Sequence, residues 1–310
     1  MTITALCASH TPLKDYMSLG DEVAAEVNAC MSTMKQWIEA FAPELVVVLG
    51  PDHFNGFFYN VMPSFCIGAA AQGVGDWKTS KMSYPTDPEL AEAAVRHCHQ
   101  SDIDVALSYQ MFVDHGGVQI LDQLFEWQNL PPVLPIFINC AAPPAPPLRR
   151  VLAFGTALGT FLSNLDRRVL VIGSGGLSHD PPIPQLHNAP PEVRRRLIEG
   201  GVLDPVARAA RQQRVIDDAG LQQLGTSERT PLNPAWDQRF LEHLSAGDYD
   251  EICLMDDASI TRDGGCGGHE IRPWIAASAA ARAAGVNNPT VHYYRAIPQW
   301  IAGYAVMTFE

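Results

Sequence analysis

The stretch Leu45-Val46-Val47-Val48-Leu49-Gly50-Pro51-Asp52-His53 decides the fold, because a continuous apolar run ends abruptly in a turn that carries a histidine. An apolar run without polar alternation is typical of a strand covered on both faces, as in a parallel sheet. Comparable runs predict further buried strands at Ile3 to Ala8, Val133 to Asn139, Val169 to Gly173 and Ile252 to Met255.

Segments with apolar residues at helical spacing lie between and after these runs. They are Glu22 to Phe41, Asp87 to His99, Val118 to Trp127, Leu148 to Asn164 and Ile271 to Ala284. Asp87-Pro88 is a good helix start, since an aspartate caps and a proline suits the first helical position. Strands that alternate with helices predict an α/β fold with a mostly parallel or mixed central sheet flanked by helices.

The C-terminal half contains one segment that departs from this alternation. Residues from about 190 to 245 are rich in Arg, Gln and Glu with scattered Leu and Val, which predicts a helical insertion that packs against another subunit. The Pro-rich stretch from Ala141 to Pro147 is interpreted as a connection within the fold. We therefore expect residues 1–310 to form a single domain that carries this insertion.

Composition excludes several classes of protein. The chain has 310 residues, 47% of them hydrophobic and 18% charged, and a formal net charge of -13. Nucleic-acid binding needs a clustered basic face, so this balance argues against such a partner. No apolar run approaches the roughly 20 residues that span a bilayer. We expect a soluble enzyme without a membrane partner.

The cysteines indicate a reducing compartment. The seven cysteines include no C-x-x-C pair, and the N-terminal stretch lacks the basic region of a signal peptide. This pattern favours free thiols and a cytoplasmic location. Cys7, Cys66 and Cys253 lie in apolar surroundings and are expected to be buried core thiols.

Four histidines stand in short motifs at the ends of strands or the starts of helices. The motifs are Ser9-His10-Thr11-Pro12, Pro51-Asp52-His53, Asp114-His115-Gly116-Gly117 and Gly175-Gly176-Leu177-Ser178-His179-Asp180. A side chain just beyond a buried strand is held by the scaffold and still faces the cleft where ligands bind. Each motif alone is also explained as a polar turn. Together they predict a metal site with separate acid/base groups, in which Asp52 orients a neighbouring imidazole.

A glutamate follows a run of glycines near the C-terminus. Glu270 comes after Gly264-Gly265-Cys266-Gly267-Gly268 and His269, and it opens the helix from Ile271 to Ala284. A glutamate is favourable at a helix start in any case. Four glycines in five positions, however, allow a close approach of the backbone to another group. His269 beside it is a candidate for supporting a metal ligand.

Two histidines and one carboxylate are the ligands of a non-haem iron(II) oxygenase, in which the remaining positions stay open for substrate and oxygen. The same ligands suit zinc in a hydrolase, so ligand type leaves the metal open. His115 and His179 are candidates for proton transfer, because histidine titrates near neutral pH.

The glycines after Val169 to Ile172 superficially suggest a dinucleotide-binding turn. The G-x-G-x-x-G pattern fails at Ser178, and Pro181-Pro182 prevent the helix that would receive the pyrophosphate. We interpret Gly173, Gly175 and Gly176 as glycines that make room for His179.

In this order, the motifs around His10, His53, His115, His179 and Glu270 resemble those of the class III extradiol ring-cleaving dioxygenases, the relatives of the catalytic subunit of protocatechuate 4,5-dioxygenase. The similarity runs essentially end to end. The resemblance implies that His10, His53 and Glu270 bind Fe(II) and that His115 and His179 are the catalytic acid/base pair. Glu242 and Glu251, which lie upstream, are alternatives for the carboxylate.

The resemblance also implies the reaction and the substrate. Expected substrates are the catechols 3-(2,3-dihydroxyphenyl)propionate and 2,3-dihydroxycinnamate, which react with O2 to give 2-hydroxy-6-oxonona-2,4-dienedioate or the corresponding triene. A homo-oligomer is expected as well. Arg262, Arg272 and Arg295 lie near the C-terminal motifs and are candidates for binding the propionate group, since guanidinium pairs well with carboxylate.

Two other hypotheses stay open at this point. One is a zinc-dependent hydrolase on a similar scaffold. The other is a non-enzymatic binding protein that keeps the family fold, whose mark would be the loss of an acid/base histidine. Both histidines are present in this chain.

Overall fold

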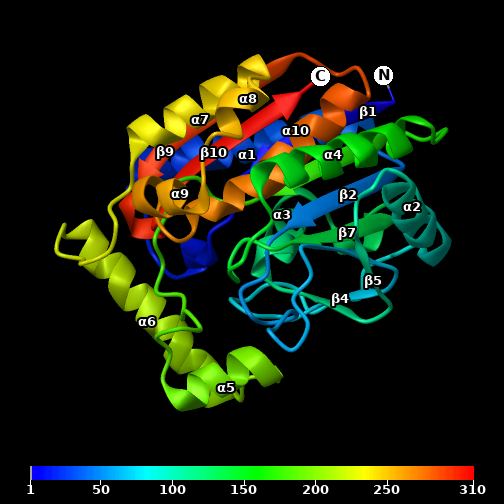
Figure 1. Ribbon diagram of the computed structural model, residues 1–310. Helices are drawn as coiled ribbons and strands as arrows, with labels where there is room; N and C mark the ends of the chain where they lie inside the picture. Colours follow the sequence, from blue (N-terminus) through cyan, green and yellow to red (C-terminus); the bar gives the residue numbers. More distant parts are fainter. Residues whose placement is uncertain (1) are drawn as a thin grey trace.

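The computed structural model describes residues 2–310 and contains a large mixed sheet between two layers of helices (Figure 1). The strands are β1 (Ile3–Ala8), β2 (Leu45–Gly50), β3 (Phe65–Gly68), β4 (Ala71–Gly73), β5 (Ala106–Ser108), β6 (Met111–Val113), β7 (Val133–Ile138), β8 (Val169–Ser174), β9 (Pro289–Ile297) and β10 (Ala302–Phe309). Eight of them form one sheet in the order β5-β3-β7-β2-β8-β1-β10-β9, and β4 pairs with β6 separately. The α/β prediction with a mixed sheet is confirmed.

The helices cover both faces of this sheet. They are α1 (Asp21–Phe41), α2 (Pro88–Gln100), α3 (His115–Leu124), α4 (Leu148–Ser163), α5 (Pro191–Glu199), α6 (Pro205–Gln223), α7 (Pro234–Ala246), α8 (Tyr249–Ile252), α9 (Asp257–Gly264) and α10 (Ile271–Ala283), with short 3-10 turns η1 (Pro12–Asp15), η2 (Trp127–Asn129), η3 (Gly268–Glu270) and η4 (Pro298–Trp300). One apolar core lies between the sheet and α2, α4 and α10, and a second lies between the sheet and α1 and α3. No helix within residues 2–310 combines the length and apolar character needed to cross a bilayer.

The central strands run parallel, and this places their ends together. β7, β2, β8 and β1 are successive parallel neighbours, and every residue of each is buried. The continuous apolar runs predicted such strands, because both faces of the sheet are covered. The carboxyl ends of β1, β2 and β8 therefore lie side by side at one edge, the usual place for ligand binding in an α/β sheet.

The predicted strand from Ile252 to Met255 is wrong. Ile252 ends the short helix α8, and Met255 lies in the connection to α9. Ile252 is buried in the first core from a helical turn, with Cys253 and Met255 packed against it, whereas Leu254 is exposed. Four apolar residues cannot distinguish a buried strand from a buried helix end.

The segment predicted as a helical insertion contains α5, α6 and α7. Helix α7 packs against β9, α8 and α9, whereas α5 and α6 extend away from the sheet (Figure 1). We refer to residues 191–223, which form α5 and α6, as the arm. Leu197 of the arm is buried in a small apolar cluster with Phe54 and Ala142, and this cluster attaches α5 to the loop after β2.

Candidate metal centre

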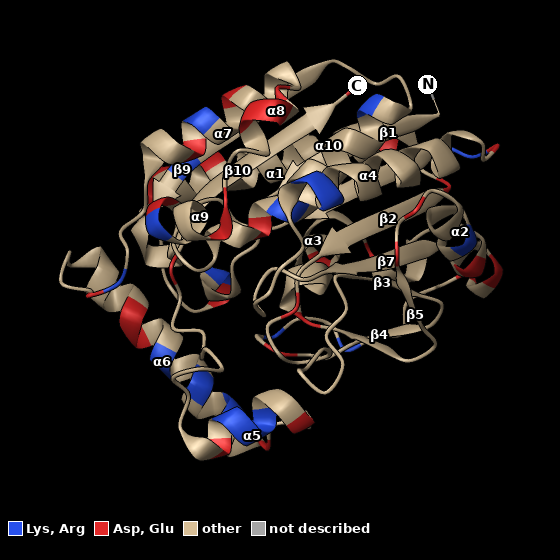
Figure 2. Ribbon diagram, viewed as in Figure 1, with Lys and Arg blue, Asp and Glu red and all other residues tan. Residues whose placement is uncertain are grey.

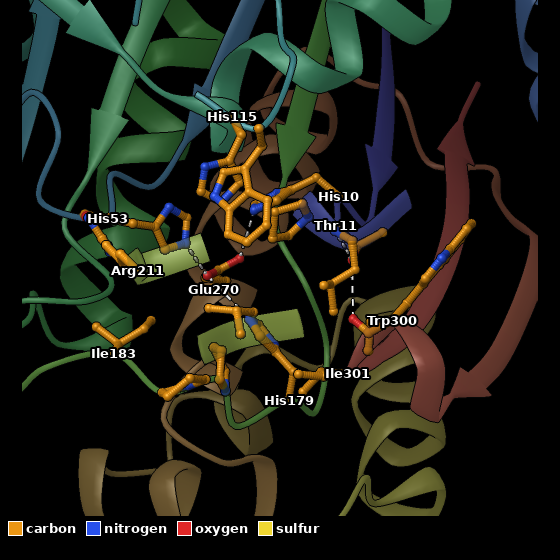
Figure 3. Close-up of a pocket in the computed structure, with 17 residues that line it drawn as sticks. His10, Thr11, His53, His115, His179, Ile183, Arg211, Glu270, Trp300 and Ile301 are labelled. Atoms are coloured by element: carbon orange, nitrogen blue, oxygen red, sulfur yellow. Dashed lines mark hydrogen bonds and ion pairs between the residues drawn. The ribbon is translucent and has the colours of Figure 1, made fainter. Parts of the chain in front are cut away.

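All five residues predicted for the site lie together at the carboxyl edge of the parallel strands (Figure 3). His10 follows β1, His53 follows β2, and His179 follows β8. His115 is the first residue of α3, and Glu270 ends the turn η3 before α10. The five side chains line one pocket although they are separated by up to 260 residues of sequence.

Glu270 lies at the middle of the cluster. Its Oε1 lies 3.0 Å from Nε2 of His53 and 3.3 Å from Nε2 of His179, and its Oε2 lies 3.5 Å from Nε2 of His10. The side chain is almost completely buried. Burial opposes its ionisation, but the charges of His179 and His10 and two histidine hydrogen bonds hold the pKa of Glu270 well below its usual range. The carboxylate is therefore present as an anion.

Three of the four pocket histidines are also close to one another. One ring nitrogen from each of His10, His53 and His115 lies within 4.8 Å of the others. The rings of His53 and His115 stack with centroids 4.4 Å apart, and the ring of His10 meets both edge-on. Burial, together with the neighbouring imidazoles, lowers the pKa of His10 to about 3, so this ring is neutral and able to bind a cation.

Each imidazole is fixed through its Nδ1 atom. Nδ1 of His53 bonds to Asp114 at 3.0 Å, and Nδ1 of His115 bonds to Asp76 at 2.6 Å. Nδ1 of His10 meets the Ser174 hydroxyl at 3.2 Å. Nδ1 of His179 donates to the backbone carbonyl of Leu177 at 2.9 Å. These bonds leave the Nε2 atoms for the pocket, the arrangement that orients metal-binding and proton-transferring histidines in other proteins.

Asp114 and Asp76 were not identified as supporting residues from the sequence. Asp114 caps α3 through Gly116 N–H and also accepts the backbone N–H of His53 at 2.8 Å. Asp76 accepts the backbone N–H of His115 at 2.9 Å. Asp76 follows no apolar strand and has no motif, so only the fold reveals it.

The expected supporting role of Asp52 is wrong. Its carboxylate accepts backbone N–H groups of Asn55, Gly56 and Phe57 and so stabilises the loop after β2. An aspartate beside a histidine in sequence faces a different direction from that histidine when the chain turns between them. The partner of His53 is Asp114, which lies 61 residues away.

His269 is turned away from the cluster. Its ring bonds to Thr261 at 2.8 Å and to the Arg272 guanidinium at 2.8 Å. It therefore supports the junction between α9 and α10 and contacts no member of the cluster through its ring nitrogens. Glu242 and Glu251, the alternative carboxylates, do not line the pocket, which leaves Glu270 as the carboxylate at this site.

The glycine run before Glu270 makes room for His179, as its close-approach pattern predicted. A Cβ atom on Gly267 would collide with the His179 ring, and one on Gly265 would collide with the His179 carbonyl. The backbone N–H of His179 donates to Gly264 at 2.8 Å, and Gly267 donates back to the His179 carbonyl at 2.9 Å. The glycines therefore fix His179 directly against the segment that carries Glu270.

The three arginines proposed for the propionate lie elsewhere. Arg272 is fully buried and pairs with Asp257 at 2.6 Å, Arg295 pairs with Glu26 at 2.8 Å, and Arg262 pairs with Asp263 at 2.7 Å. None of them lines the pocket. The arginine that does is Arg211 of α6, and apolar side chains such as Ile183, Val215 and Trp300 complete the wall (Figure 3).

All seven cysteines are free, and Cys7 and Cys66 are buried as expected. Cys253 is only partly buried. No cysteine lines the pocket, so sulfur does not contribute to the donor set.

Comparisons with known proteins show what the whole chain is similar to. The chain is 48% identical over 310 residues to the 2,3-dihydroxyphenylpropionate/2,3-dihydroxicinnamic acid 1,2-dioxygenase of Cupriavidus pinatubonensis strain JMP 134, covering 100% of this chain and 99% of that protein. It is 47% identical to the protein of the same description from Mycobacterium ulcerans strain Agy99, covering 98% of this chain and 97% of that one. A crystal structure of the uncharacterized protein JW3007 from Escherichia coli K12 matches with a TM-score of 0.49 at 16% identity over 98% of both chains.

Residues 4–306 match the family described as the catalytic LigB subunit of aromatic ring-opening dioxygenase. Its members are ring-cleaving enzymes, and the match covers nearly the whole chain. The expectation of an extradiol dioxygenase is therefore confirmed. With this match and relatives of 42–48% identity, the chain belongs to the LigB family of aromatic ring-opening dioxygenases.

Proposed function

We propose that this protein uses Fe(II) to cleave 3-(2,3-dihydroxyphenyl)propionate, and also 2,3-dihydroxycinnamate, with insertion of both atoms of O2. The products are 2-hydroxy-6-oxonona-2,4-dienedioate and the corresponding triene. The relatives named for both substrates support the substrate class. The observation that carries the proposal is the carboxylate of Glu270 between the imidazoles of His10 and His53.

These three side chains fit one metal ion. Ligand atoms about 2.1 Å from an ion and about 90° apart lie about 3.0 Å from each other. Oε1 of Glu270 lies 3.0 Å from Nε2 of His53 and Oε2 lies 3.5 Å from Nε2 of His10, so these separations support a shared ion. Two imidazoles and one carboxylate leave part of the coordination sphere open, as iron(II) oxygenases require.

A bound ferrous ion would supply positive charge that favours the catecholate, open positions for substrate and oxygen, and a way around the slow reaction of ground-state oxygen with closed-shell molecules. The chain supplies the proton transfers. The Leu177 carbonyl accepts the Nδ1 proton of His179, so Nε2 is the ring atom that faces the pocket and would exchange a proton there. His179 would take a proton from a catechol hydroxyl as the substrate binds.

His115 differs from His179 in its partner. The carboxylate of Asp76 holds Nδ1 of His115 and balances the charge of the protonated ring. His115 would therefore donate a proton from Nε2 during ring opening, when negative charge develops on oxygen. The pair lines the same pocket as the three proposed metal ligands, so both transfers would take place beside a substrate bound there.

Metal removal tests the proposal directly. Protein freed of metal should be inactive, and anaerobic Fe(II) should restore cleavage of the dihydroxyphenyl substrate to a yellow product that depends on O2. The control is the same protein loaded with Zn(II). Normal turnover without metal would contradict the proposal, and activation by zinc without oxygen consumption would favour the hydrolase.

Substitutions separate the two groups of side chains. His115→Gln and His179→Gln should retain iron and lose activity by roughly 10²- to 10⁴-fold, since that is the usual contribution of a positioned acid or base. Glu270→Gln and His53→Ala should lose iron as well, as measured by metal content after gel filtration. If both glutamine variants keep full activity, the acid/base assignment fails.

The proposed setting is the cytoplasm, and the proposed assembly is a homo-oligomer. The seven free thiols support a reducing compartment. Exposed apolar side chains on the arm, including Val206 and Leu221, support contact with another copy. Light scattering on the purified protein would measure the assembly, and a monomer at all concentrations would contradict it.

A further inference from the structure

The arm carries a concentration of positive charge in an otherwise acidic protein. Figure 2 shows basic residues gathered on α5 and the adjacent end of α6. A second cavity lies under them, and its lining includes four arginines but only one acidic residue, Glu192. The arginines are Arg196, Arg211, Arg214 and Arg229. Pro182, Ile183 and Arg211 line both this cavity and the pocket of the metal centre, so the two spaces are neighbours.

Arg211, which lies between the two cavities, has unused hydrogen-bond donors. Its Nη2 donates to the backbone carbonyl of His53 at 2.7 Å. Within residues 2–310, no carboxylate lies within 4.0 Å of its guanidinium. Burial lowers its pKa, while the more distant Asp114, Asp76 and Asp52 favour the charged form. The guanidinium is therefore fixed, cationic and without a paired anion.

Arg196 lines the same cavity as Arg211 and also has an unused hydrogen-bond donor. Its Nη2 donates to the carbonyl of Phe54 at 2.7 Å, and its guanidinium lies over the Phe58 ring. Its Nε is buried without a hydrogen-bond partner in the described part of the chain. Burial and the charge of Arg211 lower the pKa of Arg196 to about 10. Two like charges held close together without an acidic partner are relieved by binding an anion.

We propose that Arg211 binds the side-chain carboxylate of the substrate and thereby selects catechols that carry a three-carbon acid. This inference rests on the proposed function, and it names the residue that binds the acid side chain of the same substrate. The aromatic ring lies among Ile183, Val215 and Trp300, and the carboxylate meets the free donors of Arg211. The same guanidinium donates to the backbone carbonyl of His53, so the substrate carboxylate would bind next to a proposed metal ligand. Arg196 adds positive potential behind it.

Binding of 3-phenylpropionate tests the inference without requiring turnover. This molecule has the acid side chain but no hydroxyl groups, so its affinity does not depend on metal coordination. Calorimetry should show binding to the wild type and a loss of about 10- to 100-fold in affinity for Arg211→Gln, the usual effect of removing a charged hydrogen-bond donor. Arg195→Gln is the matched control, since it removes an exposed charge from the same arm without lining either cavity. Equal affinity in all three proteins would overturn the inference.

Kinetics with the iron-loaded protein provide the second measurement. For 3-(2,3-dihydroxyphenyl)propionate, Arg211→Gln should raise KM and lower kcat/KM by about 10- to 100-fold with little change in kcat. For 3-propylcatechol, which lacks the charge, the wild type and the variant should agree within about 2-fold. An equal loss on both substrates would mean that Arg211 only supports His53, and it would overturn the inference. Failure of the wild type on both catechols would contradict the proposed function, and the calorimetry would still decide the carboxylate contact.

Discussion

The hydrogen bond between Nδ1 of His115 and the Asp76 carboxylate gives the first prediction at the scale of residues. Asp76→Asn should lower kcat by roughly 10- to 100-fold while KM changes little, because an amide cannot balance the charge of the protonated ring. Steady-state kinetics on the iron-loaded enzyme measure this. Asp102→Asn, an exposed aspartate, is the control and should behave as wild type. A wild-type kcat in Asp76→Asn would remove the positioning role.

Sequence could identify the members of the cluster but not the contacts that support them. His10, His53 and His179 each follow an apolar strand, so their placement at one edge follows from the sheet type. Asp114 and Asp76 support rings through pairings across 61 and 39 residues, which no local pattern contains. Arg211 was missed because it lies on a helix of the arm, where a run of arginines resembles a solvated surface.

At the scale of elements, close packing between α4 and α10 depends on glycines of α4, which have no side chain at the contact. A Cβ atom on Gly159 would collide with the backbone of Ala280. Gly159→Ala should therefore destabilise the protein by about 1–3 kcal/mol, the usual cost of overfilling a packed contact. Urea unfolding measures the change. Gly220→Ala on α6 is the control, since nothing lies within 4 Å of the added atom, and stability there should stay equal or rise by up to about 1 kcal/mol. Equal stability of both variants would contradict the packing argument.

The start of α9 gives a prediction about pH. Hydrogen bonds from Ser259 lower the pKa of Asp256, which caps this helix. A carboxyl with a lowered pKa stabilises the folded state above about pH 4, and this contribution is lost as the pH falls. Asparagine also caps helices but does not titrate. The urea midpoints of wild type and Asp256→Asn should differ near pH 6 and converge as the pH approaches about 3.

A constant difference between these midpoints at every pH would contradict the linkage. Asp256→Ala serves as the control, because it removes the cap itself and should stay less stable than the asparagine variant throughout the range.

The elements that were predicted well from the sequence are those with long, regular patterns of apolar residues. Strands β1, β2, β7 and β8 and helices α1, α2, α4 and α10 lie within a few residues of their expected bounds. The short strands β3 to β6 and the final hairpin β9 and β10 were not predicted. Strand β9 lies at the sheet edge with much of its length exposed, which blurs its pattern. Strand β10 is wholly buried, and its mostly apolar run from Ala302 to Phe309 is typical of a strand covered on both faces.

At the scale of the whole molecule, the arm differs from the body in how it is held. It joins the loop after β2 through Leu197, Arg196 and Arg211, and α6 packs against η4. Its connections at residues 200–204 and 224–233 contain no helix or strand. Segments with few buried contacts open first and are cut first by proteases. Brief trypsin treatment should therefore cleave between Arg194 and Arg229 before any other position. Mass spectrometry identifies the cuts, and first cleavage at exposed Arg150 or Arg168 would contradict this order.

The order of strands could not be read from the sequence. Pairing between β1 and β10 joins Ala5 to Phe309, and pairing between β1 and β8 joins Ile3 to Val169. Such long-range choices depend on which faces are already covered by helices, and a periodic pattern contains no such information.

The place of β10 in the sheet has a consequence for how the fold assembles. Strand β1, which precedes His10, pairs on one side with β10, and this pairing joins Ala5 to Phe309. Until β10 is in place, one edge of β1 has no hydrogen-bonding partner. The segment that carries His10 therefore reaches its final setting only after a strand far along the chain has been added to the sheet.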